Sequence, residues 1–415
     1  MRQYSKTDFE KNQNNINFLL KEPLTADNAI RIALMNNANL QSKLQDLNVK
    51  EADLVQASRL PNPSLSYLHA SHNSALEIER RLLFNLLGIL TLPLQVDIEK
   101  RHFEHTKLQA AADILNIAAN TKKAFYSLVT AQQITDYLKQ IKDSLEASAL
   151  LARRMAEVGN WSKLMQARQQ ALYAEVMAEL AQSELRILRE KEHLIRLMGL
   201  WGEHILFDFP HQLPDLPPHL QAAQDLEQQA LITRLDIQAM KVVIEAKAKA
   251  LGLTKATHFI NVFELGYVRD SQTEAASLKG YEINLEIPLF DWGDAKVAKA
   301  EALYMQSVFH LRDLAINARS QVREAYYNYH ATFDIAKHYR DEIIPLRKNI
   351  FDESLLRYNG MLISTFELLA DLKEQMSSVL RYIELLHDFW IAETELQTVL
   401  AVSSPDHSQP DISAH

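Results

Sequence analysis

Glycine and proline are scarce in this chain, and their spacing is the feature that most limits its possible folds. The 415 residues include 9 Gly and 12 Pro. Between Pro93 and Gly159 lie 65 residues with neither, and between Gly293 and Gly360 lie 66, interrupted only by Pro345. Because Gly and Pro most often end helices, these stretches predict two very long helices. A 65-residue helix would be roughly 95 Å long, which is typical of coiled coils rather than of compact domains.

The same order of breaks occurs twice, which indicates an internal duplication. Each half reads as a medium helix, a stretch with Gly and Pro, a very long helix, a Gly turn and another long helix. The segment LPL at 92–94 aligns with IPL at 287–289, at an offset of 195. The segment ending at Gly159 aligns with the one ending at Gly360, at an offset of 201. Two structural repeats therefore make up most of the chain.

The repeats define the expected domain boundaries. The predicted segments are an N-terminal extension (1–23), a first repeat (24–206), a Pro-rich linker (207–218), a second repeat (219–402) and a disordered tail (403–415). Strand hairpins are expected at about 64–94 and 258–289, and tip turns at about 159–161 and 359–361.

Alternating residues between the predicted helices indicate strands with two different faces. Within KGYEINLEIPLFDWG (279–293), the odd-numbered positions Tyr281, Ile283, Leu285 and Ile287 are apolar. The even-numbered positions between them, Glu282, Asn284 and Glu286, are polar. A transmembrane β-strand needs roughly 9–11 residues of this kind. Parity alone leaves two interpretations open, namely membrane strands or soluble hairpins packed on a helical rod. Four strands cannot enclose a channel and an open sheet edge is unstable in lipid, so a membrane barrel would need strands from several chains.

Composition excludes several other classes of protein. The net charge of -9 and the lack of a Lys/Arg stripe argue against nucleic-acid binding, and the absence of cysteine excludes disulfides and thiol chemistry. We expect no cofactor, no metal site and no enzymatic activity, because no phosphate loop, nucleophile elbow or catalytic dyad is present. His102 and His105 flank Glu104, but surface histidines on a charged helix explain them more simply than a metal does. The polar start of the chain lacks a recognisable signal peptide, and no apolar run predicts a transmembrane helix.

From about Leu24 to Leu400 the chain resembles the TolC-like outer membrane factor family. The segment LTADNAIRIALMNNANLQSKLQDLNVKEADLVQASRLPNPSLSY resembles the opening helix and first strand of that family, and IPLFDWGDAKVAKAEA its second-hairpin exit. The segments RRMAEVGNWS and LLRYNGMLIS resemble its two helix–turn–helix tips. The order and spacing of these segments over almost the full length carry the resemblance.

The resemblance implies a mainly α fold with β hairpins, in which duplicated helix–hairpin–helix repeats form a long coiled-coil barrel. A homotrimer would share one β-barrel of 12 strands in outer-membrane lipid, with a periplasmic extension. The implied function is the exit duct of a tripartite efflux or type I secretion system, together with a periplasmic adaptor and an inner-membrane pump or transporter. The alternative is a soluble coiled-coil scaffold without channel activity.

The resemblance also assigns roles to particular residues. The tip residues expected to meet the adaptor are Gly159, Asn160, Trp161, Asn359, Gly360 and Met361. Glycine is expected at both tips because it tolerates positive φ at a helix end. Glu367 and Asp371 are possible tunnel-constriction acids, although solvated helix-surface acids are the simpler interpretation. On the second hairpin, Glu282, Asn284 and Glu286 are expected to face the lumen and the apolar parity to face lipid.

Overall fold

The computed structural model describes residues 6–72, 75–220, 225–260, 262–272 and 276–402. The predicted disordered tail, 403–415, lies outside this described part of the chain. Residues group into two compact units: unit 1 comprises Met1–Gln41, Asp113–Arg234 and Ala318–His415, and unit 2 comprises Ser42–Ala112 and Leu235–Asn317. Each unit contains residues from both repeats, so the boundaries of the units differ from the boundaries of the repeats.

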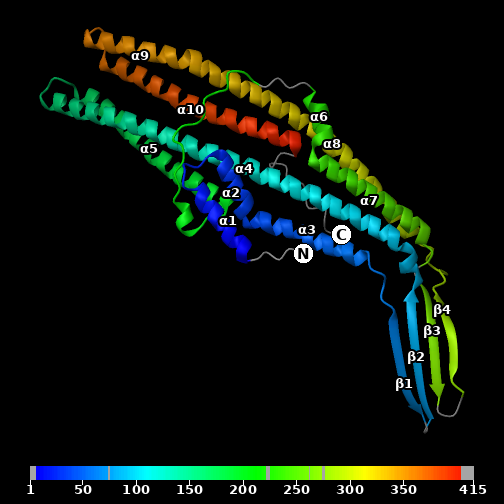
Figure 1. The fold of residues 1–415 in the computed structure, drawn as a ribbon. Coiled ribbons are helices and arrows are strands. Elements are labelled where there is room, and N and C mark those ends of the chain that lie inside the picture. The colour runs from blue at the N-terminus through cyan, green and yellow to red at the C-terminus, as the bar shows by residue number, and fades with distance from the viewer. Residues whose placement is uncertain (1–5, 73–74, 221–224, 261, 273–275, 403–415) are drawn as a thin grey trace. The chain divides into compact units, whose positions relative to one another are not determined.

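Unit 2 contains all the described strands. These strands form one antiparallel sheet in the order β1-β2-β3-β4 (Figure 1). They are β1 (Ser64–His72), β2 (Ala75–Asn85), β3 (Phe263–Gln272) and β4 (Leu278–Leu285). The two predicted hairpins therefore lie side by side, joined through β2 and β3. At the end opposite the hairpin turns, the strands connect to α3 (Ala38–Ala57), α4 (Leu86–Glu157), α7 (Leu235–Thr257) and α8 (Asp294–His338).

Both strand hairpins end earlier than predicted. The first was expected to reach residue 94, but β2 ends at Asn85 and α4 begins at Leu86. The Asn85 side chain accepts a hydrogen bond from the Gly88 backbone N–H at 2.8 Å, as a residue that caps a helix start does. The second hairpin was expected to reach residue 289, but β4 ends at Leu285. Pro288 follows closely, and its missing N–H cannot continue a strand ladder.

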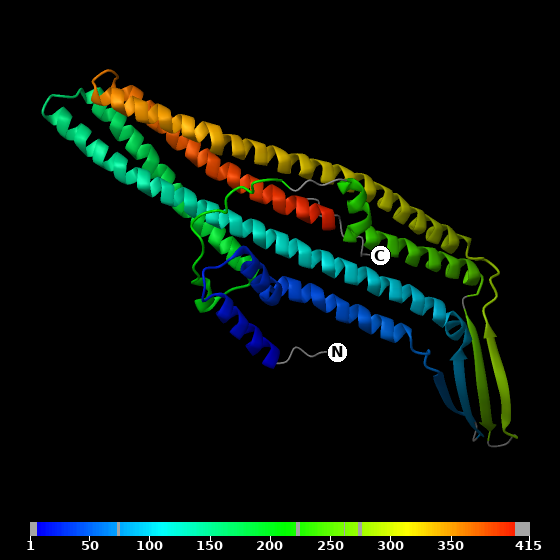
Figure 2. The ribbon, with the colours of Figure 1, turned by 45° about the horizontal axis from the view of Figure 1, so that its top comes forward.

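Unit 1 is built on two antiparallel helix pairs. In both views, α5 (Lys163–Met198) returns beside the end of α4, and α10 (Thr365–Ala401) returns beside α9 (Ile344–Asn359) (Figures 1 and 2). A five-residue π-helical turn, η2 (Tyr339–Ile343), connects α8 to α9. Pro345 follows this turn, and a proline inside a helix removes a backbone donor that a local change of helix type can accommodate.

The core of unit 1 contains apolar side chains from α4, α5, α8 and α10. Phe389 is fully buried, and its ring stacks on Tyr329 at a centroid distance of 5.4 Å. From Leu314, which belongs to unit 2, the buried apolar residues of α8 recur at intervals of three and four: Leu314, Ala318, Val322, Ala325, Tyr329, Phe333 and Ala336. This spacing is the stripe expected of a helix packed along its length against neighbours.

The N-terminal segment and the Pro-rich linker both pack against this core. The helix α1 (Lys6–Leu19) buries Ile16 completely, and α2 (Ala26–Asn36) follows it. In the linker, Leu213 and Leu216 are buried, and the Pro214 carbonyl accepts a hydrogen bond from the Trp390 indole at 3.0 Å. The short elements η1 (Gly202–Ile205) and α6 (Leu226–Thr233) flank the linker. The linker is therefore a packed part of unit 1.

Within the described residues, no helix has both the length and the apolar character needed to cross a membrane. The structure confirms the predicted class of a mainly α protein with β hairpins.

Candidate functional site

The sheet of unit 2 has one exposed apolar face. Tyr281 and Ile283 of β4 are 85% and 68% exposed, and Leu285 also points to this side. The register pairs Tyr281 with Tyr267 and Ile283 with Leu265, so the apolar character continues across β3. The Tyr267 and Tyr281 rings meet edge-on, with centroids 6.0 Å apart. These predicted lipid-facing residues therefore form one surface, while Ile287, also exposed, lies beyond the end of the strand.

The opposite face of the sheet carries the acidic side chains, although four large apolar residues also share it: Leu68, Leu83, Val268 and Leu278. The Arg81 guanidinium forms ion pairs with Glu79 and, at 3.8 Å, with Glu282. The Asn284 side chain donates a hydrogen bond to the Glu264 carboxylate at 3.3 Å. All five acids of the described strands share this parity: Glu77, Glu79, Glu264, Asp270 and Glu282. Glu286 lies just beyond β4, where its backbone N–H still bonds to the Val262 carbonyl at 3.3 Å.

The first tip turn, between α4 and α5, depends on a glycine in the left-handed conformation. Gly159 has φ of 78°. The backbone N–H groups of Asn160 and Trp161 then bond back to the Met155 carbonyl at 2.9 and 3.1 Å, which closes the end of α4. The Ser162 hydroxyl accepts a hydrogen bond from an α5 backbone N–H and caps that helix. Trp161 is half-buried at this turn.

The second tip turn, between α9 and α10, corrects the expectation for its glycine. Gly360 has φ of -80°, and the positive φ of 59° belongs to Met361. The two tips therefore reverse the chain with different residues in the left-handed conformation. Met361 is 93% exposed and its neighbour Leu362 is 77% exposed. This tip presents a pair of apolar side chains to the surroundings.

Both predicted constriction acids have partners within the protomer. Glu367 and Ser364 form a reciprocal capping box at the start of α10, with bonds of 3.3 and 3.4 Å. Asp371 accepts a hydrogen bond from the Ser354 hydroxyl of α9 at 2.6 Å. These contacts favour a helix-stabilising role for the two carboxylates over a role as a constriction ring, which stays a prediction.

Two contacts that the sequence did not predict join the two tip hairpins of unit 1. Lys373 of α10 forms an ion pair with Glu175 of α5 at 2.7 Å. Near the same ends, the Arg168 guanidinium of α5 lies 4.6 Å from the ring centroid of Phe366. These partners are about 200 residues apart in sequence, so no local pattern could have identified them.

The two histidines of α4, His102 and His105, are partly buried. Burial lowers the pKa of both His102 and His105 below the ordinary value, which favours the neutral ring. Across the part of the chain that the structure describes, no cluster of three or more His, Cys, Asp or Glu side chains could hold a metal ion.

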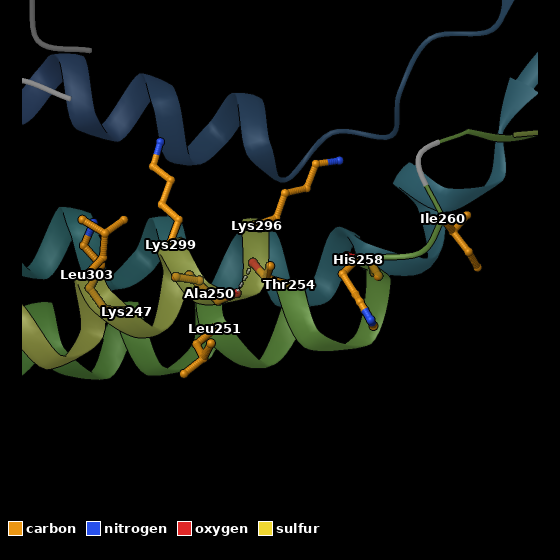
Figure 3. A pocket seen from close by; sticks show the side chains of 11 residues that line it. Lys247, Ala250, Leu251, Thr254, His258, Ile260, Lys296, Lys299 and Leu303 are labelled. Atoms are coloured by element: carbon orange, nitrogen blue, oxygen red, sulfur yellow. Dashed lines mark hydrogen bonds between the residues drawn. The ribbon is translucent and has the colours of Figure 1, made fainter. Parts of the chain in front are cut away.

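A pocket of 460 Å³ lies between α7 and α8 in unit 2. Lys247, Lys296, Lys299 and His258 contribute its titratable groups, and Leu251 is among its apolar residues. Figure 3 shows Lys296 and Lys299 extending away from Leu251, while the His258 ring points in another direction. Catalysis requires polar groups that converge on one point. The polar groups drawn in Figure 3 do not converge in this way.

Comparisons with known proteins agree with the resemblance noted in the sequence. The cobalt-zinc-cadmium resistance protein CzcC of Cupriavidus metallidurans is 19% identical over 396 residues, which cover 91% of this chain and 90% of that protein. The crystal structure of CusC matches with a TM-score of 0.77 at 16% identity, over 91% of this chain and 92% of that one. The Campylobacter jejuni CmeC outer membrane channel matches with a TM-score of 0.78 at 15% identity, over 91% and 85%. No family model matches the chain.

The matches cover about nine tenths of the chain. Similarity of this extent at such low identity establishes a common fold. The resemblance carried by the tip segments and by the spacing of Gly and Pro is confirmed: the chain has the fold of the TolC-like outer membrane factors.

Proposed function

We propose that this protein is a passive exit duct in the cell outer membrane, with helices that extend into the periplasm. The observation that carries the proposal is the two-faced sheet, whose exposed face is apolar and whose opposite face holds every strand acid. Such a sheet suits a wall between lipid and water. The fold of the whole chain supports the same function. Among the proteins that share it, CmeC is named as an outer membrane channel, and CusC is described in terms of transmembrane channel formation.

The four-stranded sheet supports the homotrimer that the resemblance implies. Each protomer provides four strands, whereas a barrel of about eight strands is only wide enough to be filled by its own side chains. Twelve strands from three protomers would leave a lumen, and would also pair the edges of β1 and β4 that lipid cannot satisfy. In this arrangement Glu282, Asn284 and Glu286 face the lumen, while Tyr281, Ile283, Leu285 and Ile287 face lipid.

The tips provide the docking surface for the remaining components. Met361 and Leu362 are highly exposed apolar side chains at the end of unit 1, and Val158 is 69% exposed at the other tip turn. We assign these residues, with the predicted tip residues around them, to contact with a periplasmic adaptor that connects the duct to an inner-membrane pump. The partners then drive opening, and the duct itself needs no cofactor and performs no catalysis.

The polar face also predicts which ions the lumen favours. Five acids and one base, Arg81, share this parity in the described strands, which gives the face a clear excess of negative charge in each protomer. Rings of carboxylates favour cations in a water-filled pore. The relative CzcC is named for resistance to cobalt, zinc and cadmium, and a cation-favouring lumen would suit cargo of that class.

Planar-bilayer recording of the purified protein tests the proposal. We expect stable trimers that conduct, with a reversal potential in a KCl gradient that shows preference for K⁺. The double variant Glu264→Gln and Glu282→Gln should reduce this preference. Arg80→Gln, which changes a charge on the opposite face of the same sheet, is the matched control and should leave it unchanged. A monomeric protein without conductance would overturn the proposal and favour the soluble scaffold.

A further inference from the structure

Three cations form a continuous row across the apolar face of the sheet. The register pairs Arg80 of β2 with Arg269 of β3, and Arg269 with Lys279 of β4. Tyr67 of β1 pairs with Arg80 and extends the row to the first strand. Side chains at directly paired positions point to the same face and lie about 5 Å apart at Cβ. All four residues are exposed.

The row lacks compensation by negative charge. None of Arg80, Arg269 and Lys279 has an ion pair or a hydrogen bond to another side chain among the described residues. The strand acids cannot supply one, because they lie at the other parity. Like charges placed directly opposite one another destabilise a sheet. An external anion bound to this row would remove that repulsion.

The neighbouring row defines the depth at which the cations lie. Two residues closer to the helices along each strand, Leu82 pairs with Tyr267, and Tyr267 with Tyr281. Tyrosine is enriched at membrane–water boundaries, where the ring is apolar and the hydroxyl is hydrated. On the other side of the cations, Ile78 and Leu76 of β2 still share this face before the first hairpin reaches its turn. The row therefore lies about 7 Å beyond a tyrosine belt, at the level expected for lipid headgroups.

We infer that Arg80, Arg269 and Lys279 form a binding site for the phosphate groups of lipids in the leaflet nearest the hairpin turns. Guanidinium groups bind phosphate through two parallel hydrogen bonds, and an ammonium adds a further charge. The site recognises lipid phosphate rather than phosphate in solution, because the tyrosine and leucine side chains next to it would contact the acyl chains of the same molecule. This inference rests on the proposed function, since it needs the apolar face to be in a membrane.

Native mass spectrometry of detergent-solubilised trimers tests the site, with lipid A as the phosphorylated probe. We expect the natural sequence to retain lipid A, and Arg80→Gln/Arg269→Gln/Lys279→Gln to bind it at least about tenfold more weakly, since each cation near an anionic surface contributes to affinity. The matched control is Arg312→Gln/Arg319→Gln/Lys348→Gln, which removes the same charge from exposed helix positions and should bind normally. Arg80→Lys/Arg269→Lys should restore most of the binding.

The outcomes separate this site from the duct itself. Conductance of the triple strand variant in neutral bilayers should be unchanged, and circular dichroism should show an intact fold. Equal retention of lipid A by the natural sequence and this variant would overturn the site, whatever the conductance. Displacement of lipid A by millimolar inorganic phosphate would overturn the assignment to lipid. Loss of conductance in every variant and in the natural sequence would instead count against the proposed duct.

Discussion

Gly293 should tolerate no side chain, and the cost of Gly293→Ala can be worked out from its surroundings. Its φ is 78°, which costs roughly 1–2 kcal/mol for a residue with a Cβ. An added Cβ would also lie 2.4 Å from the carbonyl oxygen of His258. Because this oxygen belongs to the backbone, the clash can be relieved only if the backbone moves, which costs about 1–3 kcal/mol. We therefore expect Gly293→Ala to destabilise the junction between β4 and α8 by roughly 2–5 kcal/mol.

Two other glycines separate the two contributions. Gly159 has the same φ of 78° but no heavy atom within 4 Å of an added Cβ, so Gly159→Ala should cost only the conformational part, about 1–2 kcal/mol. Gly252 lies inside α7 with free space and no positive φ, so Gly252→Ala should stabilise by about 0.5–1 kcal/mol. The difference in cost between Gly293→Ala and Gly159→Ala isolates the steric contact with His258.

Hydrogen exchange measured by mass spectrometry reports these changes where they occur. For Gly293→Ala, peptides covering the first turns of α8 should exchange roughly 30-fold to several thousand-fold faster if they exchange through local opening, because each 1.4 kcal/mol is a factor of ten. Gly252→Ala should leave the same peptides unchanged or slower. Equal protection of the α8 start in Gly293→Ala and in the natural sequence would refute the reasoning.

Three further predictions follow from the two tips and from α4. Met361→Gly should raise the stability of the second tip by about 1 kcal/mol, measured as slower local exchange, because Met361 has a positive φ of 59°; faster exchange would contradict this. Lys373→Gln should lower the melting temperature only slightly, since its exposed pair with Glu175 is worth less than about 1 kcal/mol; a large loss would show that the pair is not screened. Stability should fall as the pH drops below 6.5, because burial lowers the pKa of His102 and His105 and the unfolded chain then binds more protons. The double variant His102→Gln/His105→Gln should show a shallower loss of melting temperature between pH 7.5 and 5.5, and an unchanged slope would contradict this cause.

The features that follow from local chemistry could be predicted from the sequence. Scarce Gly and Pro predicted long helices, and α4 spans 72 residues. Alternation between Tyr281 and Leu285 predicted the two faces of β4, because side chains alternate along a strand. The glycine conformation at Gly159 also followed from its place at a helix end.

The features that depend on contacts distant in sequence could not be predicted. A run of leucines fits strand and helix alike, so the start of α4 at Leu86 depends on capping by Asn85 rather than on the pattern. Likewise, no local rule chooses Met361 over Gly360 for positive φ. Parity shows which side a residue faces but gives no register, so the row of Arg80, Arg269 and Lys279 is visible only once the strands are paired.

The spacing of buried residues along α8 has a consequence for the winding of the helices. Ala318, Val322 and Ala325 are followed by Tyr329, Phe333 and Ala336, each 11 residues later. Eleven residues in three turns make 3.67 per turn, slightly more than the 3.6 of a straight helix, whereas a seven-residue repeat gives 3.5. Helices held together along such a stripe wind around each other with a right-handed supercoil, opposite to that of ordinary coiled coils.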